Sequence, residues 1–85
     1  MEQAEVKPVT FIEGLVYLGL VERVELLECE PGFSRVVVKT RDGRLYATRC
    51  LHAQAARKLA SVWMIYVSQK WGLRSEEANS LNTPR

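Results

Sequence analysis

The chain has 85 residues, of which 47% are hydrophobic and 26% charged, with a formal net charge of +2. This length fits one small domain, and the hydrophobic content is too high for an intrinsically disordered chain. The longest apolar run, residues 62–67, is far shorter than the ~20 residues that span a bilayer. Because the N-terminus is acidic and unlike a secretory signal, we expect a complete, soluble, cytoplasmic protein that does not enter a membrane.

Charge is distributed unevenly along the chain. Residues 1–30 carry seven acidic and two basic side chains, whereas residues 31–75 carry nine basic side chains and one acidic one. Such asymmetry suggests an anionic partner. The alternative is that the two segments pack side by side and neutralise each other.

Residues 10–21 allow two interpretations. Thr10-Phe11-Ile12-Glu13 matches a capping box, which would begin a helix at Phe11. Against a helix, two glycines weaken this segment, and residues 14–21 are rich in strand formers. We prefer a bent strand that is kinked at the glycines.

The next segment predicts an antiparallel meander of three strands, or of four if the bent strand joins it. A first strand is expected within residues 20–29, and Pro31-Gly32 turns the chain into a second strand over residues 34–40. Asp42-Gly43 then predicts a two-residue type I′ turn into a third strand over residues 45–50. In this register Lys39 lies opposite Tyr46.

Residues 50–71 have the periodicity of one long helix, with polar positions on one side and apolar positions on the other. Gly72 followed by Leu73 fits a glycine helix stop. An alternative ends the helix near Ala60 and makes residues 61–69 a strand, but no turn residue separates the two halves. We therefore predict an α+β domain over residues 1–74, with the helix packed on one face of the sheet, and a flexible tail over residues 75–85.

Catalysis and metal binding are poorly supported by the composition. The chain has one histidine, His52, and one aspartate, Asp42, which the turn already explains. Cys29 and Cys50 lie in apolar surroundings and are interpreted as reduced core residues, without the paired spacing of a zinc site. We therefore predict that the protein is not an enzyme and has no metal site and no cofactor.

A basic hairpin face is the first candidate binding surface. With the type I′ register, this face carries four cations around one aromatic ring, with two helix cations extending the field: Arg35, Lys39, Arg41, Arg44 and Tyr46, then Arg57 and Lys58. Such a surface predicts a nucleic-acid-binding or regulatory module. If Pro31-Gly32 also makes a two-residue turn, glutamates would lie beside these cations and the face would be a salt-bridged surface of little functional meaning.

The aromatic side of the helix is the second candidate surface. Its residue types are those that interface cores enrich, namely Trp63, Met64, Tyr66 and Trp71. The alternative function is therefore a protein–protein interaction subunit, such as an adaptor or a small inhibitor. It would bind a partner, or a second copy as a homodimer, through this helix, or a partner through the acidic N-terminal segment. Alternatively, the N-terminal segment packs over this side of the helix and buries it within the domain.

Overall fold

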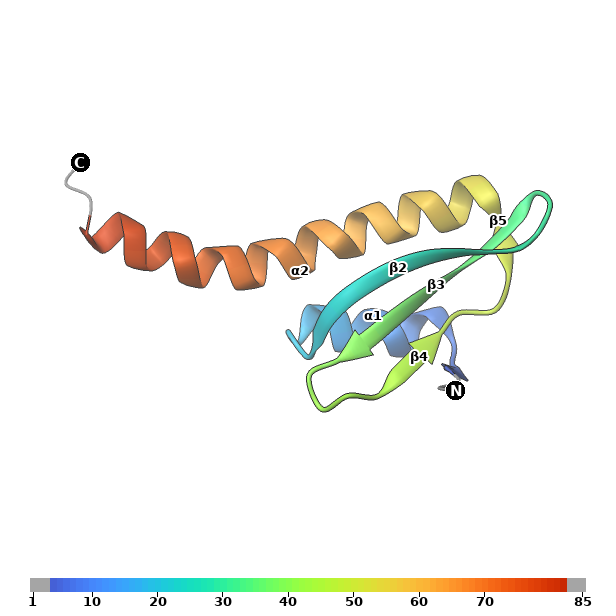
Figure 1. The fold of residues 1–85 in the computed structure, drawn as a ribbon, viewed down its shortest axis with the longest axis horizontal. Helices are drawn as coiled ribbons and strands as arrows, with labels where there is room; N and C mark the ends of the chain where they lie inside the picture. Colours follow the sequence, from blue (N-terminus) through green and yellow to red (C-terminus); the bar gives the residue numbers. More distant parts are fainter. Residues whose placement is uncertain (1–3, 83–85) are drawn as a thin grey trace.

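The computed structural model describes the backbone of residues 4–82 and the side chains of residues 4–69. Its elements follow the order β1 (Glu5–Val6), α1 (Val9–Tyr17), β2 (Val21–Glu30), β3 (Phe33–Thr40), β4 (Leu45–Ala47), β5 (Leu51–His52) and α2 (Ala53–Asn82) (Figure 1). The predicted α+β class is confirmed. The long C-terminal helix is also confirmed, because α2 is continuous over residues 61–69, and it continues past the predicted stop at Gly72.

The sheet is mixed, which corrects the prediction of a purely antiparallel meander. Its order is β1-β4-β3-β2, with β5 pairing β3 beyond the end of β4. The pairs β2–β3 and β3–β4 are antiparallel, as predicted, but β1 adds to β4 in parallel through Glu5 and Val6. Two residues are too few for an alternating pattern, so the sequence held no signal for this strand.

Residues 9–17 form a helix, so the preference for a bent strand was wrong. Gly19 has φ +79°, and its N–H donates to the carbonyl of Val16 while that of Leu20 donates to Leu15, both at 3.0 Å. These two bonds are those of a Schellman motif, which ends a helix at a left-handed glycine. The glycine that argued against a helix is therefore its stop signal.

The β3–β4 turn differs from the predicted type I′. Within the described chain no residue other than glycine has a positive φ, so Asp42 lacks the conformation that a type I′ turn requires. Instead, the N–H of Gly43 donates to Thr40 and the N–H of Thr40 donates to Arg44, and Gly43 alone is left-handed, at φ +90°. This is a three-residue loop, in which a type I turn precedes a left-handed glycine.

The longer loop shifts the strand register by one residue. Tyr46 lies opposite Val38, and Lys39 lies opposite Leu45. A shift of one residue turns a side chain to the other face of a sheet. Tyr46 therefore points toward the core, together with Val38, and leaves the face that carries Lys39.

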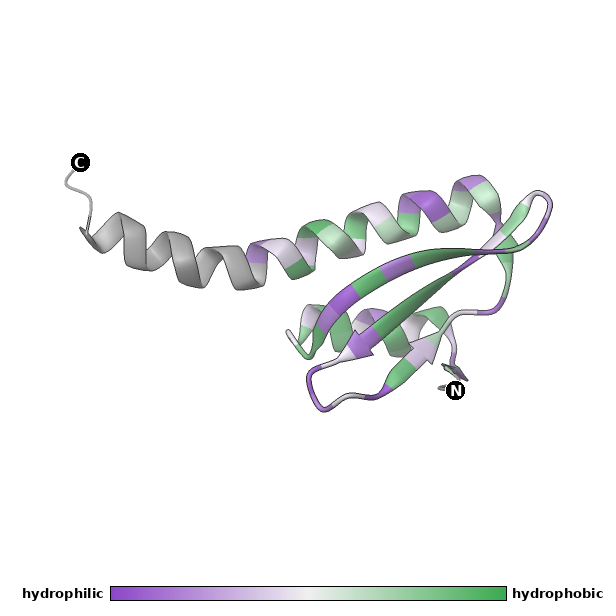
Figure 2. Cartoon of the chain, in the orientation of Figure 1, coloured by the Kyte–Doolittle hydropathy of each residue, from purple (hydrophilic) through white to green (hydrophobic). Residues whose placement is uncertain are grey.

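Both helices pack on one face of the sheet and enclose the core. α1 lies behind the strands in Figure 1, and α2 packs along β2 and β3. The buried cluster is centred on Trp63, which is fully buried, and it includes Ile12, Val16, Val21, Val24, Val36, Val38, Tyr46, Ala56 and Ala60. Hydrophilic and hydrophobic stretches are interspersed along β2 (Figure 2), and its buried residues are Val21 and Val24.

Two glycines should respond to alanine in opposite directions. Gly43→Ala places a side chain at φ +90° and should destabilise the fold by ~1 kcal/mol or more. Gly14→Ala lies within α1, where an added Cβ meets nothing within 4 Å, and should stabilise it by ~0.5–1 kcal/mol. Urea unfolding of both variants checks this. Equal effects would contradict the assignment of Gly43 as the residue that requires the left-handed conformation.

Candidate functional site

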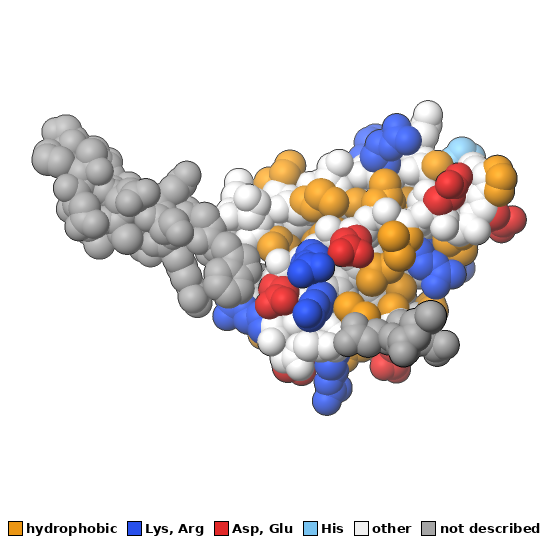
Figure 3. All heavy atoms as spheres, viewed as in Figure 1, with side chains coloured by type: hydrophobic (Ala, Val, Ile, Leu, Met, Phe, Trp, Pro, Cys, Tyr) orange, Lys and Arg blue, Asp and Glu red, His pale blue; other side chains and the backbone are white. Residues whose placement is uncertain are grey.

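The sheet face turned away from the helices, here called the open face, carries two of the predicted cations, Arg35 and Lys39. Alternation along β2 and β3 places Arg23, Leu27, Arg35, Val37 and Lys39 on it. Figure 3 shows apolar side chains gathered on this side of the molecule, beside adjacent basic and acidic ones. The open face is therefore of mixed character and not a uniformly basic platform.

Among the six predicted cations, Lys39, Arg44 and Arg35 contact acidic or sulfur-bearing side chains. The ammonium group of Lys39 lies 3.9 Å from Glu22, and the guanidinium of Arg44 lies 3.4 Å from Asp42. Both pairs are solvent-exposed, so each contributes little to the stability of the fold. Arg35 instead contacts two sulfur atoms, while Arg57 and Lys58 are exposed on α2, in the helical layer. The structure does not bring these cations together.

Tyr46 cannot stack a nucleic-acid base in this conformation. Its side chain is 8% exposed, and its ring lies edge-on to Phe11 with the centroids 5.5 Å apart. The pKa of Arg44 is raised, first through a hydrogen-bonding interaction with the Tyr46 side chain and then through neighbouring charges that include Asp42. Of the predicted aromatic–cation set, Arg44 and Tyr46 are thus close enough to interact.

Cys29 and Cys50 form a disulfide with their Cα atoms 6.2 Å apart, so their interpretation as reduced core residues was wrong. Two cysteines that are 21 positions apart gave no sequence signal for pairing. Disulfides are typical of oxidising compartments and unusual in the cytosol. The cytoplasmic location accordingly stays a prediction. Within the described chain, no helix is long and apolar enough to cross a membrane.

The predicted helix surface divides between core and solvent. Trp63 is fully buried and belongs to the core, whereas Met64 and Tyr66 are 43% and 39% exposed. The side chain of Trp71 lies outside the described residues. Trp63 was taken for an interface residue because periodicity alone does not show which part of a wide apolar arc faces the sheet.

A cluster of exposed apolar side chains lies where α1 meets α2. The rings of Tyr17 and Tyr66 are in contact, with centroids 4.5 Å apart, and Val62 is one helical turn before Tyr66. Leu18 and Ile65 follow Tyr17 and precede Tyr66 in the sequence and are the most exposed of the set, at 72% and 56%. We call these five residues the α1–α2 patch. Sequence analysis missed its α1 members because residues 14–21 were interpreted as a strand.

The hydroxyl of Tyr17 is oriented by a carboxylate on its own helix. It donates to Glu13 at 3.0 Å, and this hydrogen bond is the main reason that the pKa of Tyr17 is raised above 10.0. Tyr17 is therefore neutral at physiological pH. A neutral phenol with an apolar ring is suited to an interface, where Tyr is enriched.

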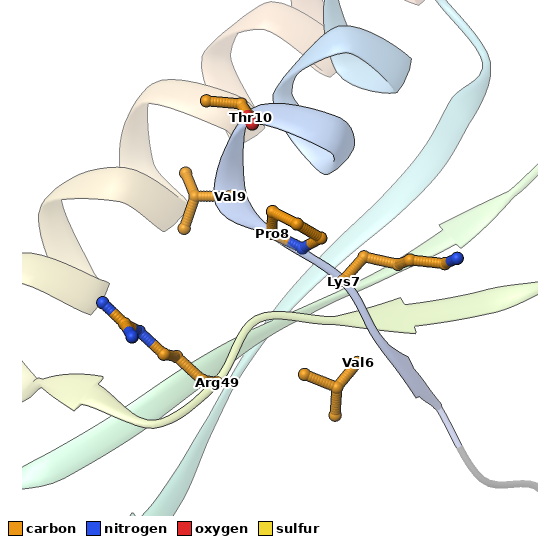
Figure 4. A pocket seen from close by; sticks show the side chains of 6 residues that line it. All are labelled: Val6, Lys7, Pro8, Val9, Thr10 and Arg49. Atoms are coloured by element: carbon orange, nitrogen blue, oxygen red, sulfur yellow. The ribbon is translucent and has the colours of Figure 1, made fainter.

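A hollow of about 510 Å³ lies beside the start of α1, lined by Val6, Lys7, Pro8, Val9, Thr10 and Arg49. Its two cations do not converge, because the Lys7 and Arg49 side chains point in different directions (Figure 4). Lys7 is already paired with Glu5 at 3.1 Å and lies 5.1 Å from the Phe11 ring centroid. Among the residues whose placement is described, no three His, Cys, Asp or Glu side chains are grouped as metal ligands.

Comparison with known proteins returned no matching family model, no matching curated protein and no matching solved structure.

Asp42 should be a sensitive probe of the β3–β4 loop. Its pKa is lowered below 3.8, first by a hydrogen bond from the Thr40 hydroxyl and then, among smaller causes, by the N–H and charge of Arg44. A lowered carboxyl pKa stabilises the fold above the unfolded pKa, and this contribution is lost as pH falls through the folded pKa. Thr40→Val should therefore raise the pKa of Asp42 more than Arg44→Gln does, as measured by carboxyl NMR titration. The reverse order would contradict the hydroxyl as the main cause.

Proposed function

We propose that the protein is a small non-enzymatic binding module that contacts a protein partner through the α1–α2 patch. The observation that carries this proposal is the contact between two exposed tyrosine rings, Tyr17 of α1 and Tyr66 of α2, with three more exposed apolar side chains next to them in sequence or one helical turn away. Contiguous exposed apolar surface on a small domain marks an interaction site more often than it marks chance exposure. The absence of catalysis stays a prediction.

The composition of the patch supports a partner of protein type. Tyrosine rings present a large, rigid, amphipathic surface, and tyrosine is frequent among the residues that dominate interface energies. Tyr17 and Tyr66 are already held against each other, so little side-chain entropy is lost when a partner covers them. Leu18 and Ile65 would then gain most from burial, because they are the most exposed.

A photo-crosslinking amino acid at Val62 should capture a partner that the same group at Arg57 does not. Both positions are exposed on α2, but they are separated by five residues and point to different sides of the helix. The expected result is a discrete product at Val62 in the cell of origin, lost when Tyr66→Asp is introduced. A crosslinked product that contains only this chain would identify a homodimer.

Equal capture from Val62 and Arg57, or capture that survives Tyr66→Asp, would contradict the α1–α2 patch as the binding surface. Circular dichroism of the Tyr66→Asp protein serves as the folding control. Tyr66 is exposed, so its replacement should leave the helical signal in place.

Nucleic-acid binding is a second candidate, favoured by the cations of the β3–β4 hairpin. Arg44 exposes 71% of its side chain and Lys39 38%, and Arg41 occupies the loop between their strands. Their carboxylate partners are solvent-exposed, so a polyanion could exchange with them at small cost. The buried Tyr46 removes the stacking ring, so this candidate rests on phosphate contacts alone.

Fluorescence anisotropy with labelled single-stranded DNA, duplex DNA and RNA across a salt series tests the second candidate. Phosphate contacts release counterions, so affinity should fall steeply with salt and disappear in the Arg41→Ala/Arg44→Ala double variant. Tyr66→Asp should leave it unchanged. Absence of binding at low salt would contradict a nucleic-acid function and leave the protein-partner proposal unaffected.

A further inference from the structure

The Cys29–Cys50 disulfide lies at two irregularities on either side of β3. In β2, Glu28 pairs with Ser34 and Glu30 pairs with Phe33, so Cys29 is the extra residue of a β-bulge. On the other side, Ala47 pairs with Val37 and Leu51 with Ser34, so four steps along this segment match three along β3. Cys50 lies in that segment, and the disulfide joins the two bulged regions across β3.

Arg35 of β3 lies between these two regions and contacts both sulfur atoms. Its Nε donates to Sγ of Cys29 and its Nη2 donates to Sγ of Cys50, each at 3.4 Å. The guanidinium is always protonated and presents its N–H groups in a fixed planar fork. One cation is therefore held against both atoms of the disulfide bond.

The contact of Arg35 with the two sulfur atoms stabilises the reduced cysteines more than it stabilises the disulfide. Disulfide sulfurs are neutral and are weak acceptors, whereas a thiolate carries a full negative charge. Hydrogen bonds with an ionised partner are roughly twice as strong as neutral ones. Arg35 thus stabilises the thiolate formed on reduction more than it stabilises the disulfide. This makes the disulfide easier to reduce.

Both cysteines are partly accessible to solvent. Cys29 and Cys50 are half-buried, and Arg35 lies on the open face, away from the core. Thiols that exchange readily are partly exposed and lie in electropositive surroundings. Other charged and titratable groups close in sequence are Glu28 and Glu30 beside Cys29, and Arg49 and His52 beside Cys50.

We propose that Cys29, Cys50 and Arg35 form a thiol–disulfide exchange site that takes a dithiol reductant. A thiolate of the dithiol attacks one sulfur of the bond, giving a mixed disulfide, and the other cysteine sulfur leaves as a thiolate beside Arg35. The second thiol of the reductant, after losing its proton, then displaces the remaining cysteine sulfur. The protein disulfide gains two electrons, the dithiol becomes a disulfide, and its two protons pass to the cysteines or to solvent.

Exchange at this site changes the covalent connection between β2 and the start of α2. Cys50 is three residues before the first residue of α2, and Cys29 is at the turn end of β2. The disulfide therefore holds the start of the long helix to the tip of the β2–β3 hairpin, and reduction removes this covalent link.

Equilibration of the full-length protein with oxidised and reduced dithiothreitol, followed by alkylation and mass measurement, tests the site. Arg35→Gln removes the charge and should lower the equilibrium constant for reduction about tenfold, equivalent to ~30 mV. Lys39→Gln is the matched control, since Lys39 is on the same strand and face but ~13 Å away along β3. It should behave as the wild type. Equal constants for the Arg35→Gln and wild-type proteins would overturn the proposal and leave a purely structural disulfide.

A second measurement does not depend on the folding of a variant. The reduced wild-type protein is alkylated with iodoacetamide across a pH series, and the rate follows the thiolate fraction. At least one cysteine should reach its half-maximal rate well below pH ~8.5, the usual value for a free cysteine. Half-maximal rates at or above that pH for both cysteines would overturn the role of Arg35.

Discussion

The left-handed conformation of Gly43 is the constraint from which much of this structure follows. Because Gly43 closes a three-residue loop, β4 pairs with β3 in the register that places Tyr46 on the core side. Tyr46 then packs against Phe11, and this contact helps to hold α1 on the same face as α2. With both helices on one face, no helix of the described residues packs on the opposite face of the sheet, where the disulfide and Arg35 lie.

The two proposed sites use different parts of the molecule and different physics. The α1–α2 patch depends on apolar burial, which is insensitive to salt, and its partner would cover Tyr17 and Tyr66. The exchange site depends on one fixed charge beside two sulfurs. They are linked through α2, which carries three of the five patch residues and begins three residues after Cys50. A change at the disulfide therefore acts on the same helix that presents the patch.

Features with a strong local signal were predicted correctly. The β2–β3–β4 meander followed from β-branched runs separated by Pro-Gly and Asp-Gly, and α2 followed from its period over residues 50–71. Where one local pattern permits two structures, the prediction failed. Gly19 weakens a helix interior and also ends helices, and Asp-Gly serves both two-residue and three-residue loops. Because the Asp-Gly loop has three residues and not two, Tyr46 lies in the core and not in the candidate site where it was predicted.

What the sequence determined by itself was the α+β class, the hairpins and the long helix, because turn chemistry and hydrophobic periodicity act over a few neighbouring residues. Only the tertiary structure decided which face of the sheet each side chain occupies. The choice of a three-residue over a two-residue loop at Gly43, the bulge at Cys29 and the parallel addition of β1 were each left open by the local sequence and are seen only in the paired strands. Since a single residue of register exchanges the two faces of a strand, these pairings decided that the cations would be dispersed and that Arg35 would meet both sulfurs.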